Sequence, residues 1–171
     1  MIGKIALYLS GAAQKARAAK FRKRYAIHAD AALGDLHITG KRVAIGKGSY
    51  YNSGYISAGN EAEVKIGTWC AIGYNVSIVA ATHDVDFPTG PESNRPMLSG
   101  NITIGDGVWI GNNVVVLPGC SIGNYAVIGA NSVVNSNIPD FAIAAGIPAR
   151  VIRSKDREKT KLHEEFVQNN R

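Results

Sequence analysis

Residues 104–134 read IGDGVW IGNNVV VLPGCS IGNYAV IGANSV V when they are divided into groups of six. Every group begins with Ile or Val, and Gly follows that residue in most groups. The same spacing joins Ile66, Ile72 and Ile78. A helix repeats near 3.6 residues and a strand alternates with a period of two, so a strict period of six fits neither. The spacing instead predicts a hexapeptide solenoid, in which three groups complete one triangular coil.

The period also predicts which side chains face outward. The residue before each repeated aliphatic residue points outward, because side chains alternate along a strand. Residues about eighteen positions apart then stack on one face, roughly 4.8 Å from coil to coil. The outward residues of the three faces are Lys65, Thr103 and Ser121, then Ala71, Trp109 and Val127, then Ser77, Val115 and Val133. One face is polar, and the other two become apolar in the later coils.

The two apolar faces predict an oligomer. Monomeric proteins rarely leave stacked Val and Trp side chains in water. A triangular prism with two such faces closes naturally as a cyclic trimer, in which each subunit offers one face to each neighbour. We therefore expect a homotrimer.

Length and composition are those of one folded domain. The chain has 171 residues, of which 46% are hydrophobic and 19% are charged, and its formal net charge is +6. Basic residues gather toward both ends, which suits anionic partners, although we expect no nucleic acid among them. No stretch approaches the length of a membrane span, and we expect a cytoplasmic protein.

The repeat divides the chain into three parts. Residues 1–30 form an N-terminal segment that we expect to be helical, because residues 2–24 lack Pro and are rich in Ala, Leu, Lys and Arg. This helix either caps the open end of the solenoid or makes a weak peripheral contact with an anionic membrane. Residues 31–153 form the solenoid, and residues 154–171 form a helical tail.

The regular part of the repeat is interrupted once, between Ile78 and Ile104. The intervening loop, residues 79–103, is far longer than a strand connection requires, and long loops on a rigid scaffold usually carry function. It contains His83, whose side chain can act as a base near neutral pH. His83 is therefore the candidate catalytic residue.

Motifs in the second half of the chain resemble those of a known family. They are IGDGVWIG at residues 104–111, Pro118-Gly119, VIGANSVV at 127–134, Ile138-Pro139 and AGIPARVI at 145–152. In this order they make residues 64–153 similar to the hexapeptide acyltransferases, in particular to the O-acetyltransferases of maltose, galactosides and surface polysaccharides. The resemblance implies an all-β fold, namely a left-handed parallel β-helix. It further implies a trimer, acetyl-CoA as the donor, no metal, and active sites between subunits.

The resemblance also implies that His83 is a general base. Its imidazole would take the proton of a sugar hydroxyl while the oxygen attacks the thioester of acetyl-CoA. Transfer would be direct, because neither Cys70 nor Cys120 lies where a nucleophile is expected. Asp86 and Asp84 either orient the imidazole, as carboxylates do in hydrolytic triads, or only shape the loop.

A set of residues at family positions would bind acetyl-CoA. They are Trp109, Gly111, Asn112, Ala130, Asn135, Ser136, Arg150 and Arg153. Backbone N–H groups around Gly111 and Asn112 would stabilise the oxyanion, and the two Arg residues would meet phosphates. One position departs from the family, because Asn135-Ser136 stands where sugar acetyltransferases commonly have Thr-Lys. Donor affinity is then lower, or Arg153 and Lys155 substitute for the missing Lys.

The saccharide acceptor would meet residues before the interruption and within it. The family places a sugar-binding Asn at a position that falls on Ser53 here, with Asn52 beside it. Arg95, in the loop, either contacts an acidic sugar or pins the loop.

Other readings of the same fold stay open. An N-acetyltransferase of a nucleotide-linked amino sugar would also need a base, so the sequence separates it weakly from an O-acetyltransferase. A zinc carbonic anhydrase would need several converging His ligands, whereas His28, His37 and His163 lie in end segments. A non-catalytic packing subunit would leave the long loop around His83 unexplained.

Overall fold

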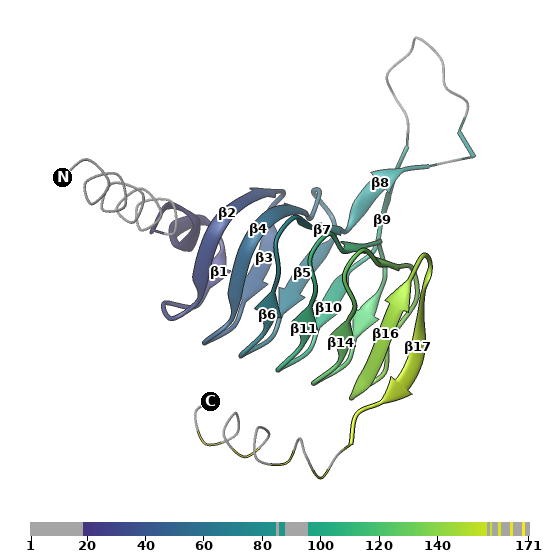
Figure 1. Ribbon diagram of the computed structural model, residues 1–171. Helices are drawn as coiled ribbons and strands as arrows, with labels where there is room; N and C mark the ends of the chain where they lie inside the picture. The colour runs from purple at the N-terminus through teal and green to yellow at the C-terminus, as the bar shows by residue number, and fades with distance from the viewer. Residues whose placement is uncertain are drawn as a thin grey trace, which may run out of the picture.

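The computed structural model describes residues 19–84, 86–87, 96–156, 158, 161, 165 and 169. Short strands wind around one axis and stack as the coils of a parallel β-helix with three faces (Figure 1). The all-β solenoid that the six-residue period predicts is therefore confirmed.

Each face of the β-helix is a ladder of strands from successive coils. The first face contains β1 (Ala26–Ile27), β3 (Arg42–Ile45), β5 (Glu63–Ile66), β10 (Ile102–Ile104) and β13 (Ser121–Ile122). The second contains the first halves of β2 (Ala32–Thr39) and β4 (Tyr50–Ser57), then β6 (Ala71–Ile72), β11 (Trp109–Ile110), β14 (Val127–Ile128), β16 (Ala142–Gly146) and β17 (Ala149–Ser154). The third contains the second halves of β2 and β4, then β7 (Val76–Val79), β12 (Val115–Val116) and β15 (Val133–Val134).

The strand registers confirm the predicted stacking of the outward side chains. The Cα partners are Lys65, Thr103 and Ser121 on the first face, Ala71, Trp109 and Val127 on the second, and Ser77, Val115 and Val133 on the third. The repeated aliphatic residues between them point inward and are buried, together with Cys70 and Cys120. The core is thus a column of small and medium aliphatic side chains along the axis.

We call the edge between the second and third faces the asparagine edge. Side-chain amides of successive coils form a ladder there. The Asn75 Nδ2 group donates to Asn113 Oδ1, and the Asn113 Nδ2 group donates to Asn131 Oδ1, each at 3.0 Å. All three residues have a positive φ, which Asn tolerates better than most residues.

The other two edges are named by what they carry. The hairpin edge, between the third and first faces, contains Gly119 and residues 135–137 and releases the long loop after β7. The aromatic edge, between the first and second faces, carries Trp69, Tyr125 and Phe141, with φ values of 57°, 59° and 60°. Tyr125 and Phe141 stack with ring centroids 5.2 Å apart, and this packing offsets the strain of a positive φ in bulky residues.

A recurring hydrogen bond joins neighbouring coils at their corners. Asp106 Oδ1 accepts the backbone N–H of Thr68 at 2.7 Å, and Asn124 Oδ1 accepts the N–H of Asp106 at 2.8 Å. On the asparagine edge Asn112 Oδ1 accepts the N–H of Tyr74 at 2.8 Å. Both members of each pair lie two positions after a repeated aliphatic residue, so a side-chain oxygen of one coil satisfies the corner of the coil before it.

The same oxygen explains why Gly so often follows the repeated aliphatic residue. A Cβ atom on Gly105 would lie 2.6 Å from Asn124 Oδ1 and 2.8 Å from the Asn124 nitrogen. A Cβ atom on Gly73 would lie 2.4 Å from Asn112 Oδ1. The next coil therefore fills the space that any other side chain would need.

Residues 19–25 cover the N-terminal end of the solenoid. Residues 19–24 are helical, and Phe21 packs against the core. The Tyr25 hydroxyl lies 3.4 Å from the carbonyl oxygens of both Ile38 and Gly40, which joins it to the first coil. The first coil begins at β1, so the solenoid starts before residue 31, the boundary predicted from the sequence.

At the other end, β17 folds back antiparallel to β16 and completes the second face. Beyond it, the described residues Glu158, Lys161, Glu165 and Asn169 are helical and exposed. None of the helices in the described part of the chain is long and apolar enough to cross a membrane.

Replacing Gly105 tests the corner packing. Gly105→Ala should lower the free energy of unfolding by about 2 kcal/mol, because the new Cβ atom meets Asn124 and the packed coil cannot give way. Urea unfolding measures the change. Thr103→Ala, an outward and exposed position on the neighbouring strand, is the control and should change little. Equal stability of Gly105→Ala and the parent protein would contradict this account of the repeat.

Candidate active site

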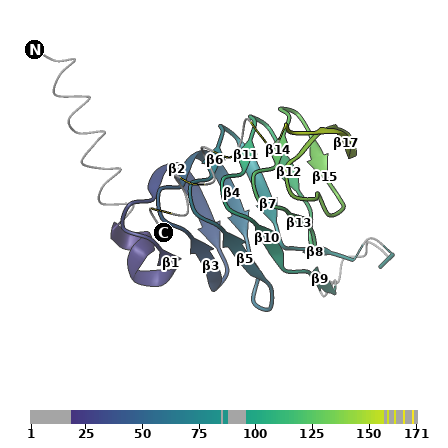
Figure 2. The same ribbon diagram turned by 90° about the horizontal axis from the view of Figure 1, so that it is seen from below.

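The candidate base lies on a two-stranded hairpin outside the coils. β8 (Ala81–His83) pairs antiparallel with β9 (Met97–Ser99), and the hairpin projects from the hairpin edge (Figures 1 and 2). His83 is exposed, and its side chain makes no hydrogen bond to any described residue. The imidazole is therefore available to a ligand.

The two candidate carboxylates shape the hairpin. Asp84 Oδ1 accepts the backbone N–H of Asp86 at 3.0 Å, and the N–H of Asp84 donates to the carbonyl of Pro96 at 3.0 Å. These bonds form a turn at the end of β8. Within the described part of the chain, neither carboxylate bonds to the His83 imidazole. Arg95, a predicted acceptor-binding residue, lies outside the described residues.

Met97 was not predicted from the sequence. It is the cross-strand partner of His83, so the two side chains share one face of the hairpin, and Met97 is 52% exposed. Pairing across a long loop leaves no periodic signal in the sequence. An apolar, mobile thioether therefore lies beside the imidazole.

Four predicted residues line the asparagine edge, and two of them already take part in its corners. Asn112 Oδ1 accepts the N–H of Tyr74, and Ser53 Oγ accepts the N–H of Asn75 at 3.0 Å. Asn52 lies next to Ser53 in β4, and its carbonyl approaches Gly34 of the preceding coil too closely to admit a Cβ atom there. Ala130 lies one coil beyond Asn112.

The backbone N–H of Gly111, which the sequence suggested as an oxyanion donor, already has a partner. This N–H donates to the carbonyl of Ile128 at 2.8 Å as part of the coil-to-coil ladder, so it is not available to a ligand. The Gly residue at this position instead leaves space for the next coil, because a Cβ atom would lie 2.7 Å from the Ala130 nitrogen.

The N–H groups of Asn112 and Ala130 are free of the corner hydrogen bond. At Thr68, Tyr74 and Asp106 the corresponding N–H is accepted by an Asp or Asn side chain of the next coil. The residue that would accept from Asn112 is Ala130, whose methyl group cannot do so. No described residue accepts the N–H of either Asn112 or Ala130. Two backbone N–H groups in adjacent coils of the asparagine edge therefore have no acceptor among the described residues.

The predicted phosphate ligands gather near the last coil. The Arg150 Nη1 group donates to the carbonyl of Ala149 at 3.0 Å and lies 3.4 Å from Asn135 Oδ1, which brings two predicted donor-binding residues together. Arg153 is exposed, and its Nη1 group donates to the Ser154 carbonyl at 3.1 Å. Lys155 is half-buried, and burial lowers the pKa of its ammonium group. Ser136 lies beside Asn135 and is exposed.

Trp109 projects from the second face with 58% of its surface exposed, between Ala71 and Val127. The asparagine edge and the hairpin edge lie on opposite sides of the third face. The path from Asn112 to Gly119 along that face is seven residues long, which is at most about 23 Å at a strand rise of roughly 3.3 Å per residue. Within one chain, the hairpin and the residues Asn112 and Ala130 therefore lie on different edges of the β-helix.

The two buried thiols are unsuited to nucleophilic chemistry. Burial raises the pKa of Cys70 to about 11, and its Sγ atom lies 3.0 Å from the Gly105 carbonyl. Burial also raises the pKa of Cys120. Both side chains therefore stay protonated at neutral pH and act as small core residues. Among the described residues no group of three or more His, Cys, Asp or Glu side chains is arranged to hold a metal ion.

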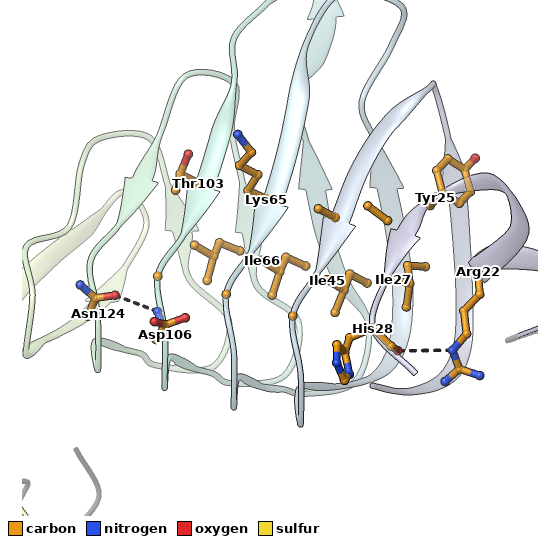
Figure 3. A pocket seen from close by; sticks show the side chains of 16 residues that line it. Arg22, Tyr25, Ile27, His28, Ile45, Lys65, Ile66, Thr103, Asp106 and Asn124 are labelled. Atoms are coloured by element: carbon orange, nitrogen blue, oxygen red, sulfur yellow. Dashed lines mark hydrogen bonds between the residues drawn. The ribbon is translucent and has the colours of Figure 1, made fainter. Parts of the chain in front are cut away.

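A groove of about 750 Å³ lies elsewhere, on the first face beside the aromatic edge (Figure 3). Arg22, His28, Lys65 and Asp106 line it, and none of the predicted site residues does. The Arg22 guanidinium is engaged by the carbonyls of His28, Ala29 and Ala31. This groove is thus separate from the hairpin and from the asparagine edge.

Comparison with known proteins assigns the chain to a family. Residues 101–136 match the family model for bacterial transferase hexapeptide repeats. A hexapeptide-repeat acetyltransferase from Vibrio cholerae, solved with acetyl-CoA, is 31% identical with a TM-score of 0.72, and the match covers 90% of this chain and 85% of that one. The chain belongs to the hexapeptide-repeat transferase family.

Two curated relatives from Escherichia coli K12 have related names. The galactoside O-acetyltransferase is 40% identical over 121 residues, which cover 70% of this chain and 58% of that protein. A putative lipopolysaccharide biosynthesis O-acetyl transferase is 38% identical over 117 residues, which cover 64% of this chain and 59% of that protein. The chain thus spans less than two thirds of the length of either relative.

Proposed function

We propose that this hexapeptide-repeat protein is an acetyl-CoA-dependent O-acetyltransferase that modifies a sugar hydroxyl. The observation that carries the proposal is the pair of free backbone N–H groups at Asn112 and Ala130. Adjacent donors on a rigid edge suit the carbonyl oxygens of a thioester and of the amide-containing arm behind it. The acetyl-CoA bound to the Vibrio cholerae relative and the names of the two Escherichia coli relatives support the same donor and reaction.

The reaction is a direct transfer with His83 as general base. The neutral imidazole takes the proton of the sugar hydroxyl as its oxygen attacks the thioester carbonyl. The Asn112 N–H stabilises the resulting oxyanion. When the carbon–sulfur bond breaks, the thiolate of CoA leaves and receives the proton from the imidazolium, which restores the base. Asp84 contributes to this step through the turn at the end of β8, in which its carboxylate accepts the backbone N–H of Asp86.

A cyclic homotrimer brings the two halves of the site together. Val115 and Val133 on the third face, with Trp109 and Val127 on the second, form the apolar surfaces that neighbours cover. We place the hairpin edge of one subunit beside the asparagine edge of the next in this trimer. His83 then faces the Asn112 and Ala130 donors across the interface, with Trp109 alongside.

The donor phosphates meet Arg150 and Arg153. Asn135 contacts Arg150 from the position next to the missing Lys, and Ser136 adds a hydroxyl. Lys155 is a weaker substitute than Arg153, because its burial disfavours the charged form.

The acceptor is a saccharide of the surface-polysaccharide or lipopolysaccharide type. The similarity to the putative lipopolysaccharide O-acetyl transferase supports this class. Asn52 and Arg95 are the proposed sugar contacts, with Met97 providing an apolar wall beside His83. Ser53 has a supporting role, because its hydroxyl is already bonded to the Asn75 N–H.

Replacing the base tests the reaction. His83→Ala should lower kcat/KM for acetyl transfer by about 10²- to 10⁴-fold, because proton removal is lost. Release of free CoA thiol, followed with an acceptor panel, measures the rate. Thr82→Ala, an exposed neighbour on β8, is the matched control and should turn over at the parental rate. Turnover of His83→Ala at the parental rate would refute the assignment. Recovery of an amide instead of an ester product would move the protein to N-acetyl transfer.

Completing the corner pattern tests the free N–H groups. Ala130→Asn supplies a side-chain oxygen where other coils have one, so it should accept the Asn112 N–H and remove an oxyanion donor. We expect kcat to fall by about 10²- to 10³-fold while thermal stability is kept or raised. Ala130→Val is the control for bulk without an acceptor. A loss of kcat in Ala130→Val as large as in Ala130→Asn would refute the role of the Asn112 donor.

A charge on the third face tests the assembly. The parent protein should have three times the 18.2 kDa chain mass by light scattering, whereas Val133→Glu should dissociate and lose activity together. Thr103→Glu, on the first face, should leave both unchanged. A monomeric parent protein with full activity would contradict the shared site.

A further inference from the structure

The N-terminal end of the β-helix is strongly basic. Within residues 19–42 the exposed cations outnumber the exposed acids. The cations are Lys20, Lys23, Arg24, Lys41 and Arg42, and the acids are Asp30 and Asp35. The helix and the corner at residues 40–42 lie together, because the Tyr25 hydroxyl bonds to the Gly40 carbonyl (Figure 1). One end of the molecule thus presents a net positive surface.

Most of these charges are available to a partner. Lys20, Lys23 and Lys41 form no ion pair with any described residue, and Arg24 lies over the ring of Tyr25 at 5.5 Å. Arg22 differs, because three backbone carbonyls hold its guanidinium as a structural clamp. A groove of about 570 Å³ between Lys20, Arg24 and His37, with Asp35 on its wall, opens on the same end.

The sequence before residue 19 indicates the kind of partner. Residues 2–9 include Ile2, Ile5, Leu7 and Leu9, and the basic residues follow. Apolar residues next to a basic cluster suit the surface of an anionic bilayer, where one part enters the interface and the other meets the headgroups. A nucleic acid would satisfy the charges but leave the apolar residues in water.

We propose that the N-terminal end of the β-helix docks on an anionic membrane surface. In the proposed trimer the threefold axis runs parallel to the axis of each β-helix, so all three N-terminal ends face one side. Three weak contacts then act together, and their combined affinity exceeds that of one by orders of magnitude.

This docking would place the reaction close to the bilayer, an implication that rests on the proposed transferase function. The hairpin leaves after the coil of β5 to β7, which is two coils beyond that of β1. At roughly 4.8 Å per coil, the base of the hairpin lies about 10 Å above the first coil. His83 would then meet saccharides attached to lipid, and the acceptor class becomes a lipid-linked glycan.

Vesicle sedimentation with the full chain tests the docking. The parent protein should bind phosphatidylcholine vesicles that contain phosphatidylglycerol, bind pure phosphatidylcholine weakly, and dissociate at high salt. Each cation near an anionic surface changes affinity about fivefold, so Lys20→Gln with Lys23→Gln should weaken binding on the order of 25-fold for one end, and by more when three ends dock together. Lys65→Gln with Lys161→Gln removes equal charge elsewhere and should bind as the parent does.

Acetylation of a free saccharide, measured on the same proteins, separates this proposal from the proposed function. Both double variants should retain that activity. Docking would be overturned if the active protein did not bind anionic vesicles. It would also be overturned if the two double variants lost affinity for these vesicles to the same extent. Tighter binding to duplex DNA than to anionic vesicles would also overturn it. Vesicle binding without any acetylation would support docking and refute the transferase.

Discussion

The structure depends on a hydrogen bond between a side-chain oxygen of one coil and a backbone N–H of the coil before it. Strand ladders satisfy the backbone along each face, but a chain that turns a corner leaves its N–H groups without a strand partner. Asp106, Asn112 and Asn124 supply the missing acceptors. This bond satisfies the corner N–H groups and leaves no space for a side chain on the adjacent Gly. A corner without the bond is therefore chemically distinct. At Ala130 the omission leaves donors for a ligand.

The six-residue period predicted the fold and the outward rows because both follow from strand geometry alone. Thr103 stacks on Lys65 although the loop intervenes, since the aliphatic residues resume in phase. The period could not predict how the loop itself pairs, because the partnership of His83 and Met97 depends on a turn outside the repeat. It also could not reveal that Gly111 is already bonded, since a backbone donor has no sequence signature.

The sequence named candidate site residues but could not give the hydrogen bonds that hold them. Arg150 and Asn135 were both expected to meet the donor, and their side chains approach each other. The sequence left open whether Asp84 orients the imidazole or shapes the loop. Its carboxylate accepts the Asp86 N–H, because a short polar side chain after a strand readily closes on the N–H two residues later. The start of the solenoid was placed too late, since β1 is only two residues long and shows no repeat by itself.

The place where the hairpin leaves the stack has a geometric meaning. Each coil adds a fixed rise along the axis, so the number of coils before β8 sets the height of His83 above the N-terminal end. Inserting or deleting one whole coil would preserve every face and corner while moving the hairpin by one step. The number of coils in the solenoid therefore sets the distance between the N-terminal end and His83 in equal steps.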